Sequence, residues 1–195
     1  IFGRVLTAMV TPMTPAGEVD EDAVLAVADH LLAHSHDGIV VNGTTGESAT
    51  LTSDESIRVI ELVAAHVGDR AVVVAGVGSN DTAHSIDMAR RAAAVGARGL
   101  LVVTPYYNKP TQPGLVAHFG AVADATDLPV LVYDIPGRTG IPIQTETLIR
   151  LAEHPRIVAV KDAKGDLWAA SQVMAATDLQ WYSGDDVLNL AHLAQ

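Results

Sequence analysis

Residues 157–162 read Ile-Val-Ala-Val-Lys-Asp, an apolar run of four residues that ends directly in a lysine and an aspartate. A β-branched run with no polar alternation is typical of a strand covered on both faces, as in a parallel sheet. The same arrangement occurs upstream, where the apolar run 130–133 leads into Asp134. This pattern favours a parallel α/β protein with polar chemistry at the carboxyl ends of its strands.

Similar runs recur along the whole chain, and helix-like segments separate them. Thr52 and Glu55 form a capping box, which predicts a helix whose apolar face ends before Gly68. That face is predicted from Ile57, Ile60, Ala64 and Val67, and a second helix is predicted from Asp81 to Val95. Seven strands are predicted, at 5–10, 39–41, 72–75, 100–103, 130–133, 157–160 and 180–183.

Two architectures fit this alternation, a doubly wound open sheet and a (β/α)8 TIM barrel. Gly76-Val77-Gly78 lacks the third glycine of a dinucleotide-binding fingerprint. Polar residues follow almost every predicted strand, which is the pattern of a barrel's active face. Because only seven strands are found, we predict one domain, residues 1–195, that is a (β/α)8 barrel truncated after about seven βα units. The eighth unit and a C-terminal helical region are predicted to be missing.

Composition excludes several classes of protein. The formal net charge of −11 argues against nucleic acid or an anionic membrane as a partner. No apolar run approaches the length of a membrane span, so no membrane partner is predicted. The chain has no cysteine, which excludes disulfides and thiolate catalysis and fits a cytoplasmic location.

Lys161 is the first candidate for chemistry. It follows an apolar run, and burial would lower the pKa of its ammonium and free a nucleophilic amine. The structural alternative is a lysine that reaches solvent or pairs with Asp162. Both interpretations remain open from the residues alone.

Hydroxyl groups near the predicted strand ends could accompany this lysine. Tyr107 and Tyr133 could relay protons with Thr44, or they could be packing residues at a barrel rim. The turn of Thr44 and Thr45, between Gly43 and Gly46, could hold a carboxylate with its N–H groups, or be an ordinary turn. Arg138, in a Pro-Gly-Arg-Thr-Gly turn, could bind a second carboxylate or lie on the surface.

Other chemistries are less well supported. His30 and His34 have helical spacing but no acidic partner that would complete a zinc motif, so we predict surface histidines and no metal site. Asp185 and Asp186 follow the seventh predicted strand, where a phosphate-binding barrel would need neutral amides. A phosphorylated substrate is therefore disfavoured.

Four motifs together resemble the dihydrodipicolinate synthase (4-hydroxy-tetrahydrodipicolinate synthase) family of class I aldolases, which also contains N-acetylneuraminate lyase. The motifs are Gly-Thr-Thr-Gly-Glu-Ser at 43–48, Thr-Pro-Tyr-Tyr-Asn-Lys-Pro at 104–110, Tyr-Asp-Ile-Pro-Gly-Arg-Thr-Gly at 133–140 and Val-Lys-Asp at 160–162. They are specific in this order, and the resemblance runs from the first strand to the last residue.

The resemblance implies a lyase that condenses pyruvate with L-aspartate 4-semialdehyde in lysine and diaminopimelate biosynthesis. Lys161 would form a Schiff base with pyruvate, so that no metal or organic cofactor is needed. Tyr133, Thr44 and Tyr107 would form a proton relay, with Tyr107 reaching a neighbouring subunit of a homodimer or homotetramer. Thr45 with Thr44 would hold the pyruvate carboxylate and Arg138 that of the semialdehyde, while Gly184 matches a position near bound pyruvate.

The resemblance leaves alternatives within and outside the family. Sialic-acid and sugar-acid aldolases share the lysine and the glycine–threonine loop, although Thr44 and Gly137-Arg138-Thr139-Gly140 favour the synthase. A catalytically incompetent truncated fragment is the alternative from another class. Feedback inhibition by lysine is expected to be weak, because Ser53, Ser56 and His84 replace the histidines and glutamate that the family's allosteric pocket would have, although Ser48, Ala49, Asn80 and Tyr106 are present.

Overall fold

The computed structural model describes all residues, 1–195, as two compact units. The first comprises Ile1–Val77 and Asp87–Leu101, and the second comprises Gly78–Ile86 and Val102–Gln195. The boundary passes through one helix and one strand, each of which contributes residues to both units. Each unit is described below by itself.

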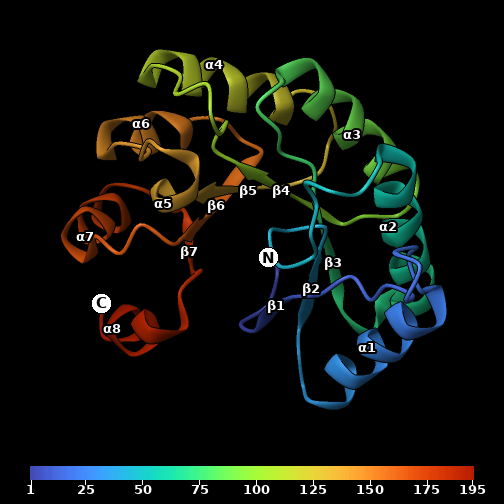
Figure 1. Ribbon diagram of the computed structural model, residues 1–195. Coiled ribbons are helices and arrows are strands. Elements are labelled where there is room, and N and C mark those ends of the chain that lie inside the picture. The colour runs from blue at the N-terminus through green and yellow to red at the C-terminus, as the bar shows by residue number, and fades with distance from the viewer. The chain divides into compact units, whose positions relative to one another are not determined.

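In the first unit, helices connect parallel strands that pair in chain order, β1 with β2, β2 with β3, and β3 with the start of β4. Figure 1 shows α1 and α2 lying along the outside of these strands. The elements are β1 (Leu6–Ala8), α1 (Glu21–Ala33), β2 (Gly38–Val41), α2 (Ser53–Val67), the 3-10 turn η1 (Gly68–Arg70), β3 (Val72–Gly76), α3 (Thr82–Ala94), of which the first turn belongs to the second unit, and β4 (Gly99–Val103).

In the second unit, too, helices connect parallel strands that pair in chain order. Thr104, just after β4, donates its backbone N–H to Tyr133 O of β5, and β5, β6 and β7 then pair in parallel. The elements are α4 (Gln112–Ala123), β5 (Val130–Asp134), α5 (Pro136–Thr139), α6 (Thr145–Leu151), β6 (Ile157–Asp162), α7 (Leu167–Ala176), β7 (Gln180–Ser183), η2 (Asp186–Leu188) and α8 (Asn189–Leu193).

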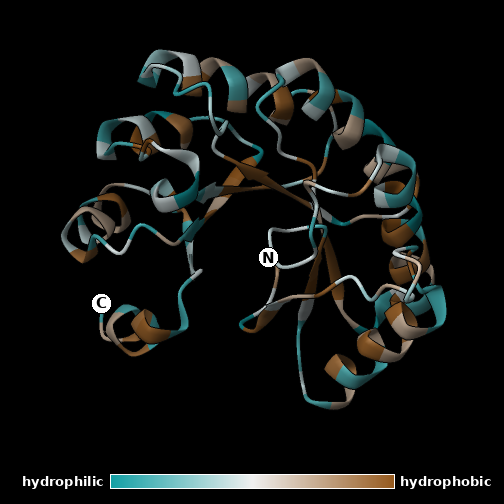
Figure 2. Ribbon diagram, viewed as in Figure 1, coloured by the Kyte–Doolittle hydropathy of each residue, from teal (hydrophilic) through white to brown (hydrophobic).

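All seven predicted strands are present, and the prediction of parallel α/β structure is confirmed. Strand β1 is shorter than predicted, Leu6–Ala8 instead of 5–10; at its start, Val5 donates its N–H to the Asp37 carboxylate at 3.0 Å. The strands are mostly hydrophobic, whereas the helices alternate between hydrophobic and hydrophilic residues (Figure 2). Apolar strands beneath amphipathic helices account for the core of each unit.

Helix α2 shows how closely local sequence rules hold. The capping box is formed, with the Thr52 hydroxyl accepting from Glu55 N–H and the Glu55 carboxylate accepting from Thr52 N–H. The helix ends at Val67 before Gly68, as predicted. The predicted apolar face was partly wrong, because Ile57 and Ala64 are only half-buried while the buried set is Ser56, Val59, Ile60, Val63 and Val67.

The pairing of β5 with β6 contains one irregularity. Val130 pairs with Ile157 but the next residue, Leu131, pairs with Ala159, so that Val158 has no counterpart. This bulge advances β6 by one residue relative to β5. Beyond it, Tyr133 lies opposite Lys161 and Asp134 opposite Asp162.

Helix lengths and hydropathy bear on the membrane prediction. No helix in the structure combines the length and apolar character that a membrane crossing requires.

Candidate functional site

The ends of β5 and β6 bring two candidate residues together. Lys161 and Tyr133 are register partners on neighbouring parallel strands, so their side chains lie on the same face of the sheet. The Lys161 ammonium is 4.3 Å from the centroid of the Tyr133 ring. Tyr133 is buried and Lys161 is half-buried. The sequence motifs at 133–140 and 160–162 therefore meet in one place in the fold.

Burial lowers the pKa of the Lys161 ammonium below its ordinary value of 10.5. Desolvation disfavours the charged form, so a larger fraction of Lys161 is the neutral, nucleophilic amine than for a lysine in water. The alternative pairing with Asp162 is not formed. The Asp162 carboxylate instead accepts the backbone N–H of Lys164 at 2.7 Å and lies 3.9 Å from His192 Nε2.

Gly184, after β7, approaches the Lys161 side chain closely. A Cβ atom at this position would lie 3.2 Å from Lys161 Cε and 3.2 Å from the Asp162 carbonyl oxygen. The Gly184 N–H donates to that same carbonyl at 2.7 Å, which fixes the approach. Glycine thus leaves space beside the Lys161 side chain that any larger residue would reduce.

Tyr107 lies in the loop that follows β4. It is four residues beyond the end of β4, and its side chain is 88% exposed. Its backbone has φ +70°, a region that is uncommon for a tyrosine and that is concentrated at functional positions. The interpretation of Tyr107 as a packing residue is therefore wrong for this chain, because a ring so exposed is not packed within it.

Arg138 lies on α5, the four-residue helix that follows β5. The residue is exposed, and Gly140 ends the helix in the left-handed conformation that glycine favours. The Arg138 backbone N–H donates to Ile135 O at 2.9 Å. No acidic side chain forms an ion pair with the Arg138 guanidinium within this unit.

Thr44 and Thr45 belong to the first unit, in the turn that follows β2. The turn is closed by hydrogen bonds from Gly46 N–H to Gly43 O (3.0 Å) and from Glu47 N–H to Thr44 O (3.1 Å). Both threonines are exposed, and none of the hydrogen bonds of the turn uses their backbone N–H groups. These two N–H groups are thus suited to an anionic ligand.

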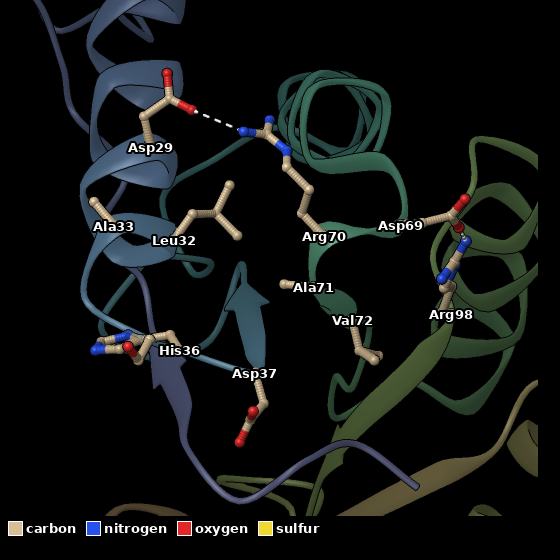
Figure 3. A pocket seen from close by; sticks show the side chains of 11 residues that line it. Asp29, Leu32, Ala33, His36, Asp37, Asp69, Arg70, Ala71, Val72 and Arg98 are labelled. Atoms are coloured by element: carbon tan, nitrogen blue, oxygen red, sulfur yellow. Dashed lines mark hydrogen bonds and ion pairs between the residues drawn. The ribbon is translucent and has the colours of Figure 1, made fainter.

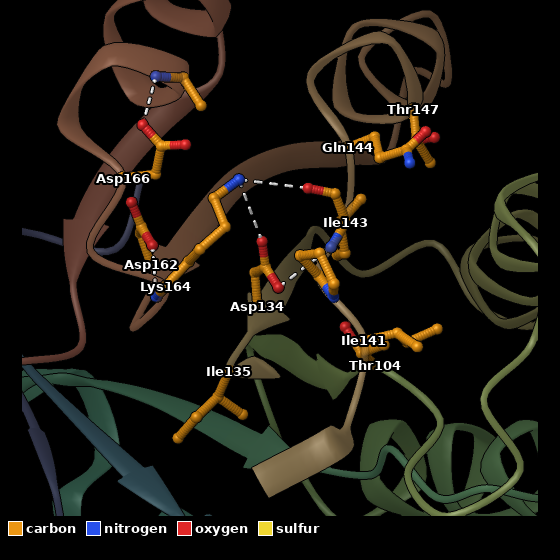
Figure 4. Close-up of polar contacts among 12 residues, drawn as sticks. Thr104, Asp134, Ile135, Ile141, Ile143, Gln144, Thr147, Asp162, Lys164 and Asp166 are labelled. Carbon is orange, nitrogen blue, oxygen red and sulfur yellow. Dashed lines mark hydrogen bonds and ion pairs between the residues drawn. The ribbon is translucent and has the colours of Figure 1, made fainter. Parts of the chain in front are cut away.

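A buried polar cluster that was not predicted from the sequence lies at the ends of β5 and β6 (Figure 4). Asp134 and Asp162 are each 1% exposed, and Lys164 lies 3.5 Å from Asp134 Oδ2. Burial raises the pKa of Asp134 to about 6, although the Lys164 charge and a hydrogen bond from Ile143 N–H oppose this rise. The sequence signal was the aspartate that directly follows each of Tyr133 and Lys161.

A groove of about 680 Å³ lies in the first unit, at the amino ends of β2 and β3 (Figure 3). Its charges are already satisfied within the protein. Arg70 Nη1 is 3.6 Å from Asp29, Arg98 pairs with Asp69, and Asp37 accepts two backbone N–H groups. Because the candidate residues follow the carboxyl ends of the strands, this groove is a structural feature rather than a reactive site.

The prediction that His30 and His34 lie on the surface is confirmed. His30 and His34 are exposed on and just after α1, with their ring centroids 4.2 Å apart. The His34 Nδ1 atom lies 2.7 Å from the His30 carbonyl oxygen. These contacts are local to the helix end.

Parallel strands alternating with helices, with polar side chains just beyond the strands, define an α/β protein of the (β/α)8 barrel class. The profile of the Dihydrodipicolinate synthetase family matches residues 1–194. The chain belongs to this family. The identification from the four motifs is therefore confirmed.

Similar proteins support the assignment. A 4-hydroxy-tetrahydrodipicolinate synthase of Kineococcus radiotolerans is 62% identical over 194 residues, which are 100% of this chain and 63% of that protein. One from Acidothermus cellulolyticus is 63% identical over 99% of this chain and 63% of its own length. The chain thus spans just under two thirds of the length of these relatives.

Solved structures agree. A crystal structure of dihydrodipicolinate synthase from Bacillus anthracis has a TM-score of 0.98 and 43% identity, covering 100% of this chain and 67% of that one. The Thermotoga maritima enzyme has a TM-score of 0.95 and 35% identity, covering 99% and 67%. These likenesses confirm the predicted fold class, a (β/α)8 barrel of which this chain carries seven strand–helix units.

Proposed function

We propose that the protein is a lyase that condenses pyruvate with L-aspartate 4-semialdehyde to give 4-hydroxy-tetrahydrodipicolinate, as part of lysine and diaminopimelate biosynthesis. The observation that carries the proposal is the half-buried Lys161, whose pKa is lowered by desolvation and whose ammonium faces the Tyr133 ring. The names of relatives that are more than 60% identical to this chain support the same reaction.

The proposed chemistry begins at the Lys161 amine. The neutral amine adds to the pyruvate carbonyl, and loss of water leaves a protonated imine on Nζ. Loss of a proton from the methyl group gives an enamine, whose terminal carbon forms the new carbon–carbon bond to the aldehyde carbon of the semialdehyde, while the aldehyde oxygen takes up a proton. The amino group of the bound semialdehyde then replaces Lys161 Nζ at the imine carbon, which closes the ring and releases the product. The cationic imine accepts the electron pair in this sequence, so we propose that no metal or organic cofactor takes part.

Other residues would manage protons and carboxylates. We assign proton transfer to the hydroxyl groups of Tyr133, Thr44 and Tyr107, and pyruvate-carboxylate binding to the N–H groups of Thr44 and Thr45. The unused N–H groups of that turn support the second assignment. Arg138 would bind the semialdehyde carboxylate, for which an exposed guanidinium with a planar pair of donors is well suited.

Gly184 would keep the space beside the Lys161 amine open for pyruvate. Its closeness to Lys161 Cε supports this role. Tyr107 would act in the site of a neighbouring subunit, so the functional protein would be a homodimer or homotetramer; its 88% exposure supports this assignment. The absence of cysteine from the sequence supports a cytoplasmic location.

Borohydride reduction in the presence of pyruvate tests the proposal. Mass spectrometry should find a pyruvyl group on Lys161 of the parent protein and none in Lys161→Met. Lys109→Met is the matched control, because Lys109 is an exposed lysine of the same unit, and this variant should still be labelled at Lys161. A folded parent protein that gains no adduct would refute the proposal and favour a catalytically incompetent chain.

A second step separates the members of the family. Aspartate semialdehyde should consume the trappable adduct, whereas N-acetylmannosamine should not. The opposite result would assign the chain to the N-acetylneuraminate lyase or sugar-acid aldolase type.

A further inference from the structure

The loop between β5 and α6 is closed at its base by one aspartate. Asp134, the last residue of β5, accepts the backbone N–H of Ile143 through Oδ1 at 3.1 Å. The two ends of residues 135–143 are thereby held together, with α5 and Arg138 between them. Figure 4 shows Asp134 and Ile143 facing each other at this point.

Lys164, two residues after the end of β6, contacts both Asp134 and Ile143. Its Nζ donates to Ile143 O at 3.2 Å and lies 3.5 Å from Asp134 Oδ2 (Figure 4). Its own backbone N–H donates to Asp162 Oδ1 at 2.7 Å, which anchors the lysine to the strand that carries Lys161. We call Asp134, Ile143 and Lys164 the loop clasp.

Burial gives the loop clasp a strong preference for this arrangement. The Lys164 side chain is 13% exposed and that of Asp134 is 1% exposed. Removing one member of such a buried pair leaves the other charge without compensation, which is far more unfavourable than loss of an exposed ion pair. The Lys164–Asp134 pair is thus a buried structural ion pair and not a surface contact.

Outside the loop clasp, the loop is joined to its surroundings by a hydrogen bond from Gln112 Nε2 of α4 to Pro142 O at 3.0 Å, which lies beyond α5. A four-residue helix is far below the length at which a helix is stable alone, and no side chain caps its amino end. The Thr139 hydroxyl lies within hydrogen-bonding distance of two carbonyls of the loop itself, Ile135 O at 3.1 Å and Ile141 O at 3.0 Å. These contacts make the loop compact, whereas the loop clasp joins it to the strands.

We propose that Lys164, acting through Asp134 and Ile143, is a positioning residue that holds the Arg138 loop in the orientation needed to bind the carboxylate of the second substrate. This inference rests on the proposed function for the role of Arg138, although the order of the loop can be measured without it. A residue that only stabilised the fold would affect both substrates alike. A positioning residue for Arg138 affects the second substrate and leaves imine formation at Lys161 intact.

The test compares the parent protein with Lys164→Met. Hydrogen exchange read by mass spectrometry over residues 135–144 should be at least roughly tenfold faster in the variant, because Ile143 O loses its donor and Asp134, which accepts the Ile143 N–H, loses the cation beside it. The rate of pyruvate trapping on Lys161 should change less than about threefold, while the concentration of aspartate semialdehyde that half-discharges the imine should rise roughly tenfold or more.

Arg150→Met is the matched control. It also removes a cation in the second unit, but Arg150 is exposed and pairs with Glu153 within the same helical turn. It should leave loop exchange, trapping and discharge unchanged. If Lys164→Met does not fold, Asp134→Asn replaces it, since this variant removes the charge attraction and keeps the side-chain volume.

The outcomes separate the inference from the proposed function. Equal exchange of residues 135–144 in the parent protein and the variant overturns the inference, as does an unchanged half-discharging concentration. A parent protein that traps no pyruvate, or whose adduct the semialdehyde does not discharge, refutes the proposed function. In that case the exchange measurement alone decides whether Lys164 holds the loop.

Discussion

Substitution of Asp134 by asparagine should change how the stability of the protein depends on pH. Asp134 is the buried carboxyl at the end of β5, and desolvation raises its pKa to about 6 from an ordinary value of 3.8. The folded state therefore binds this proton more tightly than the unfolded chain does. Between these two pH values, raising the pH removes the proton from the unfolded chain first and so destabilises the folded state.

The magnitude follows from the two pKa values. Each pH unit in this window corresponds to about 1.4 kcal/mol, so the whole shift corresponds to about 3 kcal/mol. The contribution of Asp134 is fully present below about pH 4 and is lost as the pH rises through about 6. An asparagine side chain at this position has no proton to lose, so the variant should lack this part of the pH dependence.

The assay is urea unfolding of both proteins at a series of pH values from about 4 to about 7, followed by circular dichroism. The quantity to compare is the difference in free energy of unfolding between the parent protein and Asp134→Asn. Relative to the variant, the parent protein should lose about 3 kcal/mol across this range. Asp178→Asn is the control, because it makes the same substitution at an exposed carboxyl outside the buried cluster.

A difference that stays constant with pH for Asp134→Asn would refute the reasoning. So would a difference of the opposite sign, because it would mean that Lys164 and the Ile143 N–H outweigh desolvation and hold the pKa of Asp134 below its ordinary value.

Four further predictions concern the Lys161 amine, Gly184, inhibition by lysine and the cap of α2. The rate of borohydride-trappable imine formation at Lys161 should rise with pH and level off below pH 10.5, since burial lowers the pKa of the amine; a plateau only above that value would contradict this. Gly184→Ala should slow trapping severalfold with little loss of stability, because its Cβ would lie 3.2 Å from Lys161 Cε; unchanged trapping would count against it. Lysine at millimolar concentration should inhibit weakly or not at all in the enzyme assay, and strong inhibition would overturn that expectation. Thr52→Ala should lower the free energy of unfolding by about 1 kcal/mol through loss of the α2 capping box, whereas no change in urea unfolding would show that the cap contributes nothing.

Local sequence rules predicted most of the fold. The run at 157–160 forms β6 because β-branched side chains suit a strand covered on both faces, and the capping box at Thr52 begins α2 at the predicted residue. The face of α2 was less predictable. Ser56 is buried although it is polar, because burial depends on the direction in which the helix packs rather than on the residue alone.

The candidate site was partly predictable, because local sequence rules also indicate where strands end. Lys161 and Tyr133 each end an apolar run, and parallel pairing brings such ends together. The loop clasp was not predictable, because Asp134 and Lys164 are distant in sequence and meet through the backbone of Ile143, which has no sequence signature. Tyr107 follows the predicted strand as expected, but its uncommon backbone conformation has no sequence signature.

The bulge at Val158 determines which residues face each other at the ends of β5 and β6. If Val158 paired with Leu131 instead of being skipped, the ladder that starts at Val130 and Ile157 would bring Val160 opposite Tyr133. The amine would then be one rung out of place, and because neighbouring residues of a strand point to opposite faces, it would lie on the other side of the sheet from the tyrosine. The lysine–tyrosine pairing thus depends on one valine being left out of the ladder, three residues before the lysine and without any reactive group of its own. Deletion of Val158 should therefore keep Lys161 opposite Tyr133 and reactive toward pyruvate, because Ile157, Ala159, Val160 and Lys161 would then pair in unbroken register with Val130–Tyr133.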